Sequence, residues 1–235
     1  MGRVTALVVA AGEGRRFGGP SPKQFLPLGG LPLLAHTLRA LAVPGLVDGL
    51  VVAVPAGEEG RCHAEVVAPL ALPVPVALVP GGALRQASVR AALARVEPGA
   101  DLVLVHDGVR PFVPRRDLAA VIAAARAHGA AILAVPVTDT LKRAGPDGRP
   151  LVVSETVPRE GLWVALTPQA FRRDLIVQAH DAAEGTGTTA TDDAVLVERL
   201  GHPVALVPGS RTNIKITGPE DLAMAEALLA RGAAG

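Results

Sequence analysis

Hydrophobic runs rich in valine and leucine alternate with stretches rich in alanine and leucine along most of the chain. The runs lack polar alternation, which is typical of strands that are covered on both faces. Strands that alternate with helices predict a mostly parallel sheet with helices on both sides. We expect strands at Thr5–Ala10, Gly49–Val54, Val74–Val79, Asp101–His106, Ala130–Val135 and His202–Val207. We expect helices at Leu31–Ala42, Glu58–Pro69, Ala83–Val96, Arg115–His128, about Pro168–Glu184, from a cap at Thr191 or Asp192 to Leu200, and Pro219–Arg231.

This pattern breaks after Pro136. The segments Asp139–Ala144 and Pro150–Glu155 are short and more polar, and Gly145-Pro146-Asp147-Gly148-Arg149 between them has strong turn chemistry. A polar hairpin has little core to join in a buried parallel sheet. We therefore predict one domain over residues 1–235, with a hairpin arm at about residues 137–163 that finds a partner.

Composition narrows the class of protein. The chain has 235 residues and a formal net charge of +1, which gives no reason to expect nucleic acid as a partner. No apolar stretch approaches the ~20 residues that span a membrane. Cys62 is the only cysteine, so an intrachain disulfide is impossible and a reducing, cytoplasmic location is expected.

A glycine-rich segment, Val9–Gly18, directly follows the first predicted strand. Backbone N–H groups of such loops can cradle phosphate. The segment lacks the Gly-Lys-Ser/Thr of a Walker A loop, and its third glycine comes one position too late for a dinucleotide fingerprint. Because it contains Arg16 and continues to Lys23, it suits a triphosphate. The alternative is a structural loop with two solvated arginines.

Two further strand ends carry candidate chemistry. Gly81–Ser88 could present backbone groups and a hydroxyl to a base, although a tight strand-to-helix turn explains it equally well. His106–Pro111 places an acid, a glycine and an arginine where ligands bind in open parallel sheets. His106 itself is interpreted as a packed strand-end residue, and Asp192-Asp193 as a helix-capping pair rather than a metal site.

Taken in order, the segments AAGxGxR…PKQ, GGxxRxxSV, HDxxRP, PVxDTxK, GLWxxxTPQ, TDDA and NIKxT resemble the 2-C-methyl-D-erythritol 4-phosphate cytidylyltransferases of non-mevalonate isoprene biosynthesis. The resemblance runs from Val4 to about Leu229. It implies a Rossmann-like doubly wound sheet, a homodimer built through the arm, and transfer of CMP from CTP to methylerythritol phosphate with release of pyrophosphate. It also implies Mg²⁺, bound mainly through the CTP phosphates. Val9, Ala83 and Gly108 depart from residues common in the family, which affects the expected ribose contacts.

Roles follow from the resemblance, motif by motif. Residues expected to bind the nucleotide are Ala10, Ala11, Gly12, Gly14, Gly82, Ser88, Asp107 and Gly108. Residues expected at the reacting phosphates are Arg16, Lys23 and Lys215. Residues expected to bind methylerythritol phosphate are Arg110, Thr140, Thr167, Lys215 and Arg159, the last from the other subunit. No metal-ligating residue is assigned.

The chemistry expected of such a site is simple. The acceptor phosphate is already an anion, so its in-line attack on the α-phosphate needs positioning and cations rather than a general base. Three alternatives stay open: a cytidylyltransferase for another acceptor such as ribitol phosphate, an NAD(P)-binding oxidoreductase, and a binding protein without activity. The displaced glycine and the absence of tyrosine count against the oxidoreductase.

Overall fold

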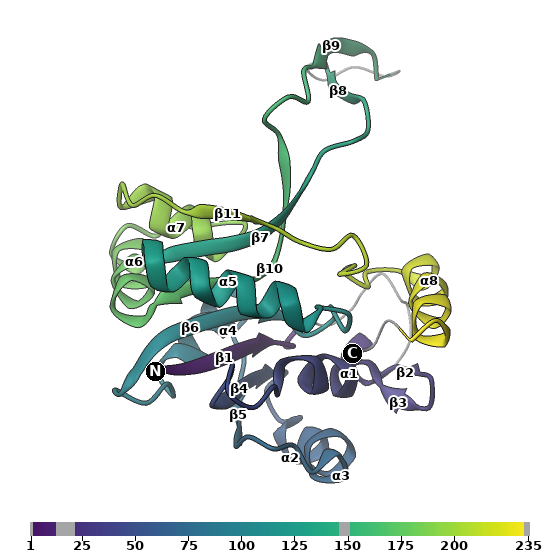
Figure 1. Ribbon diagram of the computed structural model, residues 1–235, viewed down its shortest axis with the longest axis vertical. Coiled ribbons are helices and arrows are strands. Elements are labelled where there is room, and N and C mark those ends of the chain that lie inside the picture. Colours follow the sequence, from purple (N-terminus) through teal and green to yellow (C-terminus); the bar gives the residue numbers. More distant parts are fainter. Residues whose placement is uncertain (1, 13–21, 146–150, 233–235) are drawn as a thin grey trace.

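The computed structural model describes residues 2–12, 22–145 and 151–232, and a seven-stranded sheet forms its centre (Figure 1). The strands lie in the order β11-β7-β10-β6-β1-β4-β5. Their bounds are β1 (Arg3–Val9), β4 (Gly49–Val54), β5 (Val76–Pro80), β6 (Ala100–Asp107), β7 (Ala130–Pro136), β10 (Trp163–Arg172) and β11 (Ala205–Pro208). Neighbouring strands are parallel except for β10, which is antiparallel to both β6 and β7. The predicted mostly parallel α/β fold is confirmed.

Helices cover both faces of this sheet. One face carries α1 (Leu33–Leu41), α5 (Arg115–His128) and a helical stretch made of α2 (Glu59–Cys62), η3 (His63–Val67) and α3 (Ala68–Leu70). The opposite face carries α4 (Arg85–Leu93), α6 (Arg173–Gly185) and α7 (Asp193–Arg199). The last helix, α8 (Pro219–Ala230), packs beside the small ribbon of β2 (Pro27–Leu28) and β3 (Leu31–Pro32). Among the described residues, no helix has the length and apolarity needed to cross a bilayer.

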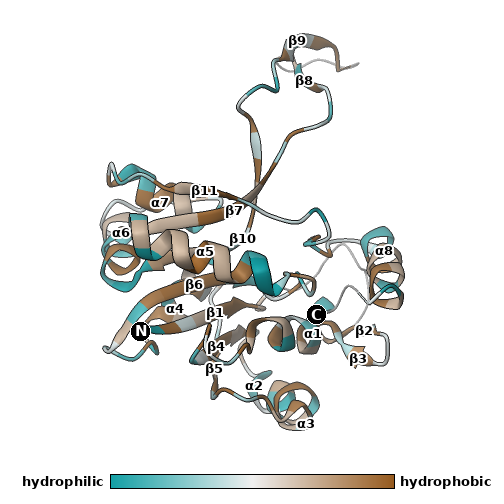
Figure 2. Cartoon of the chain, viewed as in Figure 1, coloured by the Kyte–Doolittle hydropathy of each residue, from teal (hydrophilic) through white to brown (hydrophobic). Residues whose placement is uncertain are grey.

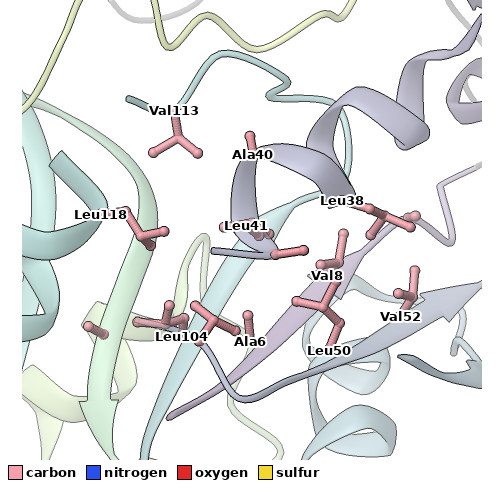
Figure 3. Packing of buried hydrophobic residues seen from close by; sticks show 14 of the residues in the cluster. Ala6, Val8, Leu38, Ala40, Leu41, Leu50, Val52, Leu104, Val113 and Leu118 are labelled. Carbon is pink, nitrogen blue, oxygen red and sulfur yellow. The ribbon is translucent and has the colours of Figure 1, made fainter. Parts of the chain in front are cut away.

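The core explains why the strands lack polar alternation. Along β1, Ala6 and Val8 pack into the cluster beneath α1 and α5, whereas Leu7 between them packs toward α4 and α6. Figure 3 shows the first cluster, in which Leu38 and Leu41 of α1 lie against Val8. Figure 2 shows mostly hydrophobic colours along the central strands β6 and β7. Burying each valine or leucine side chain contributes about 1.5–3 kcal/mol, so both faces must stay apolar.

One predicted element is wrong. The helix expected at about Pro168–Glu184 begins only at Arg173, because the preceding residues form the C-terminal half of β10. Pro168 suggested the start of a helix, because proline is common at the first position of helices and rare in central strands. The strand accommodates it at a shift in register between Ala165 and Gln169, where the pairing with β7 is interrupted.

The hairpin is present as an extension of the sheet. β8 (Leu141–Ala144) pairs antiparallel with β9 (Val153–Val157), slightly later in the chain than predicted. Figure 1 shows the two strands held away from the sheet on long connections. Its surface is less polar than expected, because Leu151, Val152 and Val153 are all more than half exposed (76%, 63% and 62%).

Candidate active site

The site lies where the direction of strand addition reverses. From β1 the chain builds outward through β4 and β5, then crosses back to place β6 on the other side of β1. In open sheets with parallel strands, ligands bind outside the carboxyl ends at such a switch point. Here the two strand ends touch, since the Gly108 N–H donates to the Val9 carbonyl over 2.9 Å. A Cβ on Gly108 would come within 2.8 Å of the Ala10 Cβ, so a residue without a side chain suits this close approach.

A cavity of about 190 Å³ opens at this edge. Five parts of the chain enclose it: the end of β1 with its loop, the η2 turn (Lys23–Phe25), the turn into α4, the end of β6, and the segment before α8 that carries Lys215. Its lining consists of Val9, Ala10, Ala11, Gly12, Lys23, Gln24, Gly82, Ala83, Leu84, Arg85, Ser88, Asp107, Val109 and Lys215. Most of the predicted nucleotide residues that the structure describes are therefore in one place.

The turn into α4 contains Gly81 and Gly82, because neighbouring side chains leave no room for a Cβ at either position. A Cβ on Gly81 would lie 2.2 Å from the Ala11 Cβ, and one on Gly82 would lie 2.5 Å from the Ala87 Cβ. The Ser88 hydroxyl accepts a hydrogen bond from the Gly82 N–H at 3.1 Å. Ser88 thus shapes a tight strand-to-helix turn, which also forms a wall of the cavity. Recognition of a base by this segment stays a prediction.

Asp107 is the only carboxylate in the described part of the lining, and cations surround it. Its Oδ2 atom lies 3.0 Å from Lys215 Nζ and 3.2 Å from Arg110 Nε, and its Oδ1 atom lies 3.5 Å from Arg85 Nε. Asp107 is only 6% exposed, and burial by itself raises the pKa of a carboxyl group. The attraction of Lys215, Arg85 and Arg110 outweighs that effect and holds the pKa of Asp107 well below its ordinary value. Asp107 is consequently an ionised acceptor, not a proton carrier.

Two lysines from distant parts of the sequence meet here. Lys23 Nζ donates to the backbone carbonyl of Ile216 at 3.4 Å, and Lys215 Nζ binds Asp107. The Lys215 side chain remains 40% exposed. With Arg85, the described wall carries three cationic groups against one carboxylate, which favours an anionic ligand of several charges.

Sequence comparison agrees with this geometry. The sequence profile of IspD, 2-C-methyl-D-erythritol 4-phosphate cytidylyltransferase, matches residues 4–231. The chain belongs to this family. It is 49% identical over 229 residues to the 2-C-methyl-D-erythritol 4-phosphate cytidylyltransferase of Pelotomaculum thermopropionicum, covering 97% of this chain and 95% of that protein.

Two other relatives place the chain within the family. It is 51% identical over 232 residues to the bifunctional enzyme IspD/IspF of Desulforudis audaxviator, matching 99% of this chain but 58% of that longer protein. The crystal structure of the 2-C-methyl-D-erythritol 4-phosphate cytidylyltransferase from Thermus thermophilus is 42% identical and superposes with a TM-score of 0.79, over 97% of this chain and 99% of that one. The chain thus spans 95% of the single-function relative and 58% of the bifunctional one.

Some predicted IspD site residues lie outside this cavity lining. Gly14 and Arg16 fall outside the described residues. Arg110 and Thr167 are buried behind Asp107, and their polar groups have protein partners. Arg110 binds Asp107 and donates to the Asn213 carbonyl at 2.8 Å. The Thr167 hydroxyl accepts from the Asp107 N–H at 3.1 Å and contacts His106 Nδ1 at 3.0 Å.

His106 is packed at the strand end, as the sequence predicted. Its ring is fully buried and contacts Thr167 through Nδ1 and the Arg110 carbonyl through Nε2. Burial lowers the pKa of His106 to about 4 because the charged imidazole would lose its hydration. The neutral ring therefore links the Arg110 carbonyl to the Thr167 hydroxyl, which itself accepts from the Asp107 N–H.

Thr140 and Arg159 belong to the arm. Both are exposed, and Arg159 donates to the backbone carbonyl of Thr138 within the same hairpin. Neither lines the cavity of its own chain. This placement separates the predicted acceptor residues of the arm from the predicted nucleotide residues.

Sequence reasoning assigned no role to Arg85 or Gln24, although both stand in the motifs that carried the resemblance. Both line the cavity, and Arg85 bridges two buried carboxylates, Asp107 and Asp193. The sequence contains a signal for Arg85, because it directly follows the glycine turn. Nothing local indicates that its second partner lies more than a hundred residues away.

Proposed function

We propose that this chain transfers the CMP group of CTP to 2-C-methyl-D-erythritol 4-phosphate and releases pyrophosphate. Membership of the IspD family supports the substrates. The single structural observation that carries the proposal is the meeting of Lys23 and Lys215 at one cavity beside the ends of β1 and β6. A cavity with clustered cations suits a triphosphate and a second phosphorylated substrate.

In the proposed reaction, a phosphate oxygen of the acceptor attacks the α-phosphorus of CTP as the bond to the pyrophosphate oxygen breaks. Both reactants are anions, so the main barrier contributions come from charge repulsion and alignment. Lys23 and Lys215, with Arg16, stabilise the crowded phosphates. Asp107, held ionised by its cations, orients Lys215 over 3.0 Å. The glycine turn and the β1 loop accept the nucleoside.

In the proposed reaction, a divalent metal would be held mainly by the nucleotide. Among the described residues, no group of three or more His, Cys, Asp or Glu side chains is arranged to hold a metal ion. Asp107 is already bound by three cations, which makes it a poor metal ligand. We place Mg²⁺ on the triphosphate oxygens, where it would neutralise charge when bound.

The acceptor side of the site is proposed to require a homodimer. Thr140 and Arg159 lie on an arm that projects from its own sheet (Figure 1). The arm also exposes Leu151, Val152, Val153 and Trp163. Three of these residues are consecutive, and exposed apolar side chains that gather in this way are typical of interaction surfaces. A second copy of the chain would cover them and receive Arg159 beside its own cavity.

The cytoplasm is the proposed location. The only cysteine, Cys62, is buried, and burial raises the pKa of its thiol to about 12. A single inert thiol is typical of proteins from a reducing compartment.

The direct test is pyrophosphate release from CTP, ATP, GTP or UTP, each with methylerythritol phosphate or ribitol phosphate, with and without Mg²⁺. We expect release only with CTP, methylerythritol phosphate and the metal. Release with ribitol phosphate instead would retain the mechanism and change the acceptor. A folded protein that is silent with every pair would contradict the proposal.

A further inference from the structure

A chain of buried polar contacts leads from the cavity into the core beneath α6. Arg85, in the cavity wall, donates from Nη1 to Asp193 Oδ2 over 2.6 Å. The other oxygen of the same carboxylate, Oδ1, lies 3.0 Å from His180 Nε2. His180 is on α6 and Asp193 begins α7, and these two helices pack against each other.

Asp193 is held in place by several groups at once. It is 1% exposed, and its backbone N–H donates to Gln169 Oε1 at 3.2 Å. Burial opposes ionisation of this carboxyl, but the His180 hydrogen bond and the charge of Arg85 hold the pKa of Asp193 below its ordinary value. Arg85 therefore faces a fixed negative charge. A buried carboxylate that lost one of these partners would be strongly destabilised.

The two carboxylate oxygens of Asp193 bind different residues: Oδ2 binds Arg85 and Oδ1 binds His180. An ionised carboxylate only accepts hydrogen bonds, so His180 Nε2 must carry the proton and donate. Within the described residues, its other nitrogen, Nδ1, is buried without a hydrogen-bond partner. The bond to Asp193 is thus the polar contact that fixes this ring. By holding Oδ1, His180 sets the rotation of the carboxylate and aims Oδ2 at Arg85.

The position of Arg85 depends on a fixed Asp193 because the guanidinium lies between two carboxylates, those of Asp193 and Asp107. Its Nε lies 3.5 Å from Asp107, a longer contact than the 2.6 Å bond to Asp193. If Asp193 turned away, Arg85 would be free to close on Asp107. Arg85 faces Oδ1 of Asp107, whereas Lys215 binds Oδ2, so that movement would alter the nucleotide wall and leave the Lys215 contact in place.

We propose that His180 is a positioning residue for the nucleotide. Acting through Asp193, it holds Arg85 in the wall of the cavity beside Gly82 and Ser88, at the distance from Asp107 that leaves room for the ligand. The inference rests on the proposed function in one respect, namely that the cavity takes CTP. His180 touches neither substrate, so its removal weakens nucleotide binding more than it slows the chemical step.

The experiment compares His180→Leu with His180→Gln. Leucine removes the donor, whereas the glutamine amide can donate from a position close to Nε2. We expect His180→Leu to raise KM and Kd for CTP about tenfold, while kcat and KM for methylerythritol phosphate change less than about twofold. We expect His180→Gln to recover most of the affinity. Ile176→Val, a buried change on the same helix, controls for loss of stability alone and leaves KM for CTP unchanged.

A double variant tests whether the effect passes through Asp193. If it does, His180→Leu adds little to the loss already caused by Asp193→Asn, since both changes break one chain of contacts. Additive losses would contradict the relay. Unchanged CTP affinity in His180→Leu, equal losses in Ile176→Val, or no recovery in His180→Gln would each overturn the proposal.

The binding measurement separates this inference from the proposed function. Kd is first measured for CTP, ATP, GTP and UTP with the wild-type chain, and the variants are compared on the nucleotide that binds most tightly. A preference other than CTP would contradict the proposed substrate. Wild-type affinity for that nucleotide in His180→Leu would contradict the positioning role, whichever nucleotide it is.

Discussion

The cavity and the arm differ in how far one chain completes them. At the cavity, cations and carboxylates from several parts of the sequence already bind one another at 2.6–3.5 Å. In the arm, Thr140 and Arg159 are exposed, and the hydrogen bond of Arg159 stays within its own hairpin. Under the proposed function, one chain holds the nucleotide side of the site in place, and the acceptor side is expected to need a second copy.

Electrostatics accounts for the difference. A lone buried charge is costly, so the cluster around Asp107 exists only because its charges are mutually compensated. Arm charges are solvated and need no such partners. Their ion pairs, such as Arg143 with Glu155, are exposed on both sides and contribute little to stability. The arm can therefore expose apolar and basic side chains, which is what the proposed interface requires.

The largest effect is expected from Lys23→Ala. Removing a cation from the proposed phosphate site should lower kcat roughly 10²–10³-fold, or about 2.7–4 kcal/mol of transition-state stabilisation. Steady-state kinetics of pyrophosphate release measures this. The control is Arg126→Ala, an exposed cation on α5 that contacts Gly2 at the opposite end of β1, and it should keep wild-type kcat. A Lys23→Ala enzyme with near-native turnover would remove Lys23 from the chemistry.

The arm should govern assembly. Val152→Asp places a charge on an exposed apolar side chain that the dimer is expected to bury. Burial of valine contributes about 1.5–3 kcal/mol, so the dimer dissociation constant should rise roughly tenfold to a few hundredfold. Sedimentation over a range of concentrations gives this constant. Met224→Asp, at a similarly exposed site on α8, should leave it unchanged. Equal effects of both variants would argue against an interface at the arm.

Arg159→Ala should separate the two substrates. Loss of one charge-assisted contact to the acceptor phosphate predicts a rise of about tenfold or more in KM for methylerythritol phosphate, with little change for CTP. Arg143→Ala, which removes another exposed arginine of the arm, should affect neither constant. Equal changes in both Michaelis constants with Arg159→Ala would contradict a role confined to the acceptor.

The smallest effect on turnover is expected at His106, where stability is the readout. The pKa of about 4 lies below the unfolded value of about 6.5, so the unfolded chain takes up a proton first as the pH falls. The contribution of neutral His106 to the free energy of unfolding is fully present above about pH 6.5. It is lost as the pH falls toward 4, at no more than about 1.4 kcal/mol per pH unit. The free energy of unfolding, measured with urea at several pH values between 7.5 and 4.5, should change less steeply with pH in His106→Gln than in the wild type. The exposed His128→Gln should keep the wild-type slope, and an unchanged slope in His106→Gln would contradict this assignment.

Local pattern predicted most of the fold. Unbroken apolar runs located β1, β4, β6 and β7 to within a few residues, because both faces of these strands are buried. The same logic failed for β10, where Pro168 and polar Gln169 lie in a buried strand. Gln169 can be buried because it bonds to the backbone N–H of Asp193 and the side chain of Asp192. These partners lie too far along the chain for a local pattern to indicate them.

The site divides in the same way. Residues of one short motif that line the cavity, such as Ala10 to Gly12, could be located because their spacing is local. The links between Arg85, Asp193 and His180 could not, since they join helices far apart in the sequence. The prediction of Asp192-Asp193 as a helix-capping pair was correct for Asp192, whose side chain accepts from the Val195 N–H. The side chain of Asp193 is buried instead and binds Arg85 and His180.

The division of labour between cavity and arm is tested most directly by mixing two impaired variants, Lys23→Ala and Arg159→Ala, after separate purification and subunit exchange. The assay uses methylerythritol phosphate well below its KM, where both variants are expected to be slow. In a mixed dimer, one site combines an intact cavity with an intact partner arm, while the other site carries both changes. Random exchange of equal amounts should therefore restore about a quarter of wild-type turnover. Activity that stays at the average of the two separate variants would show that each arm serves its own chain, and would contradict the account.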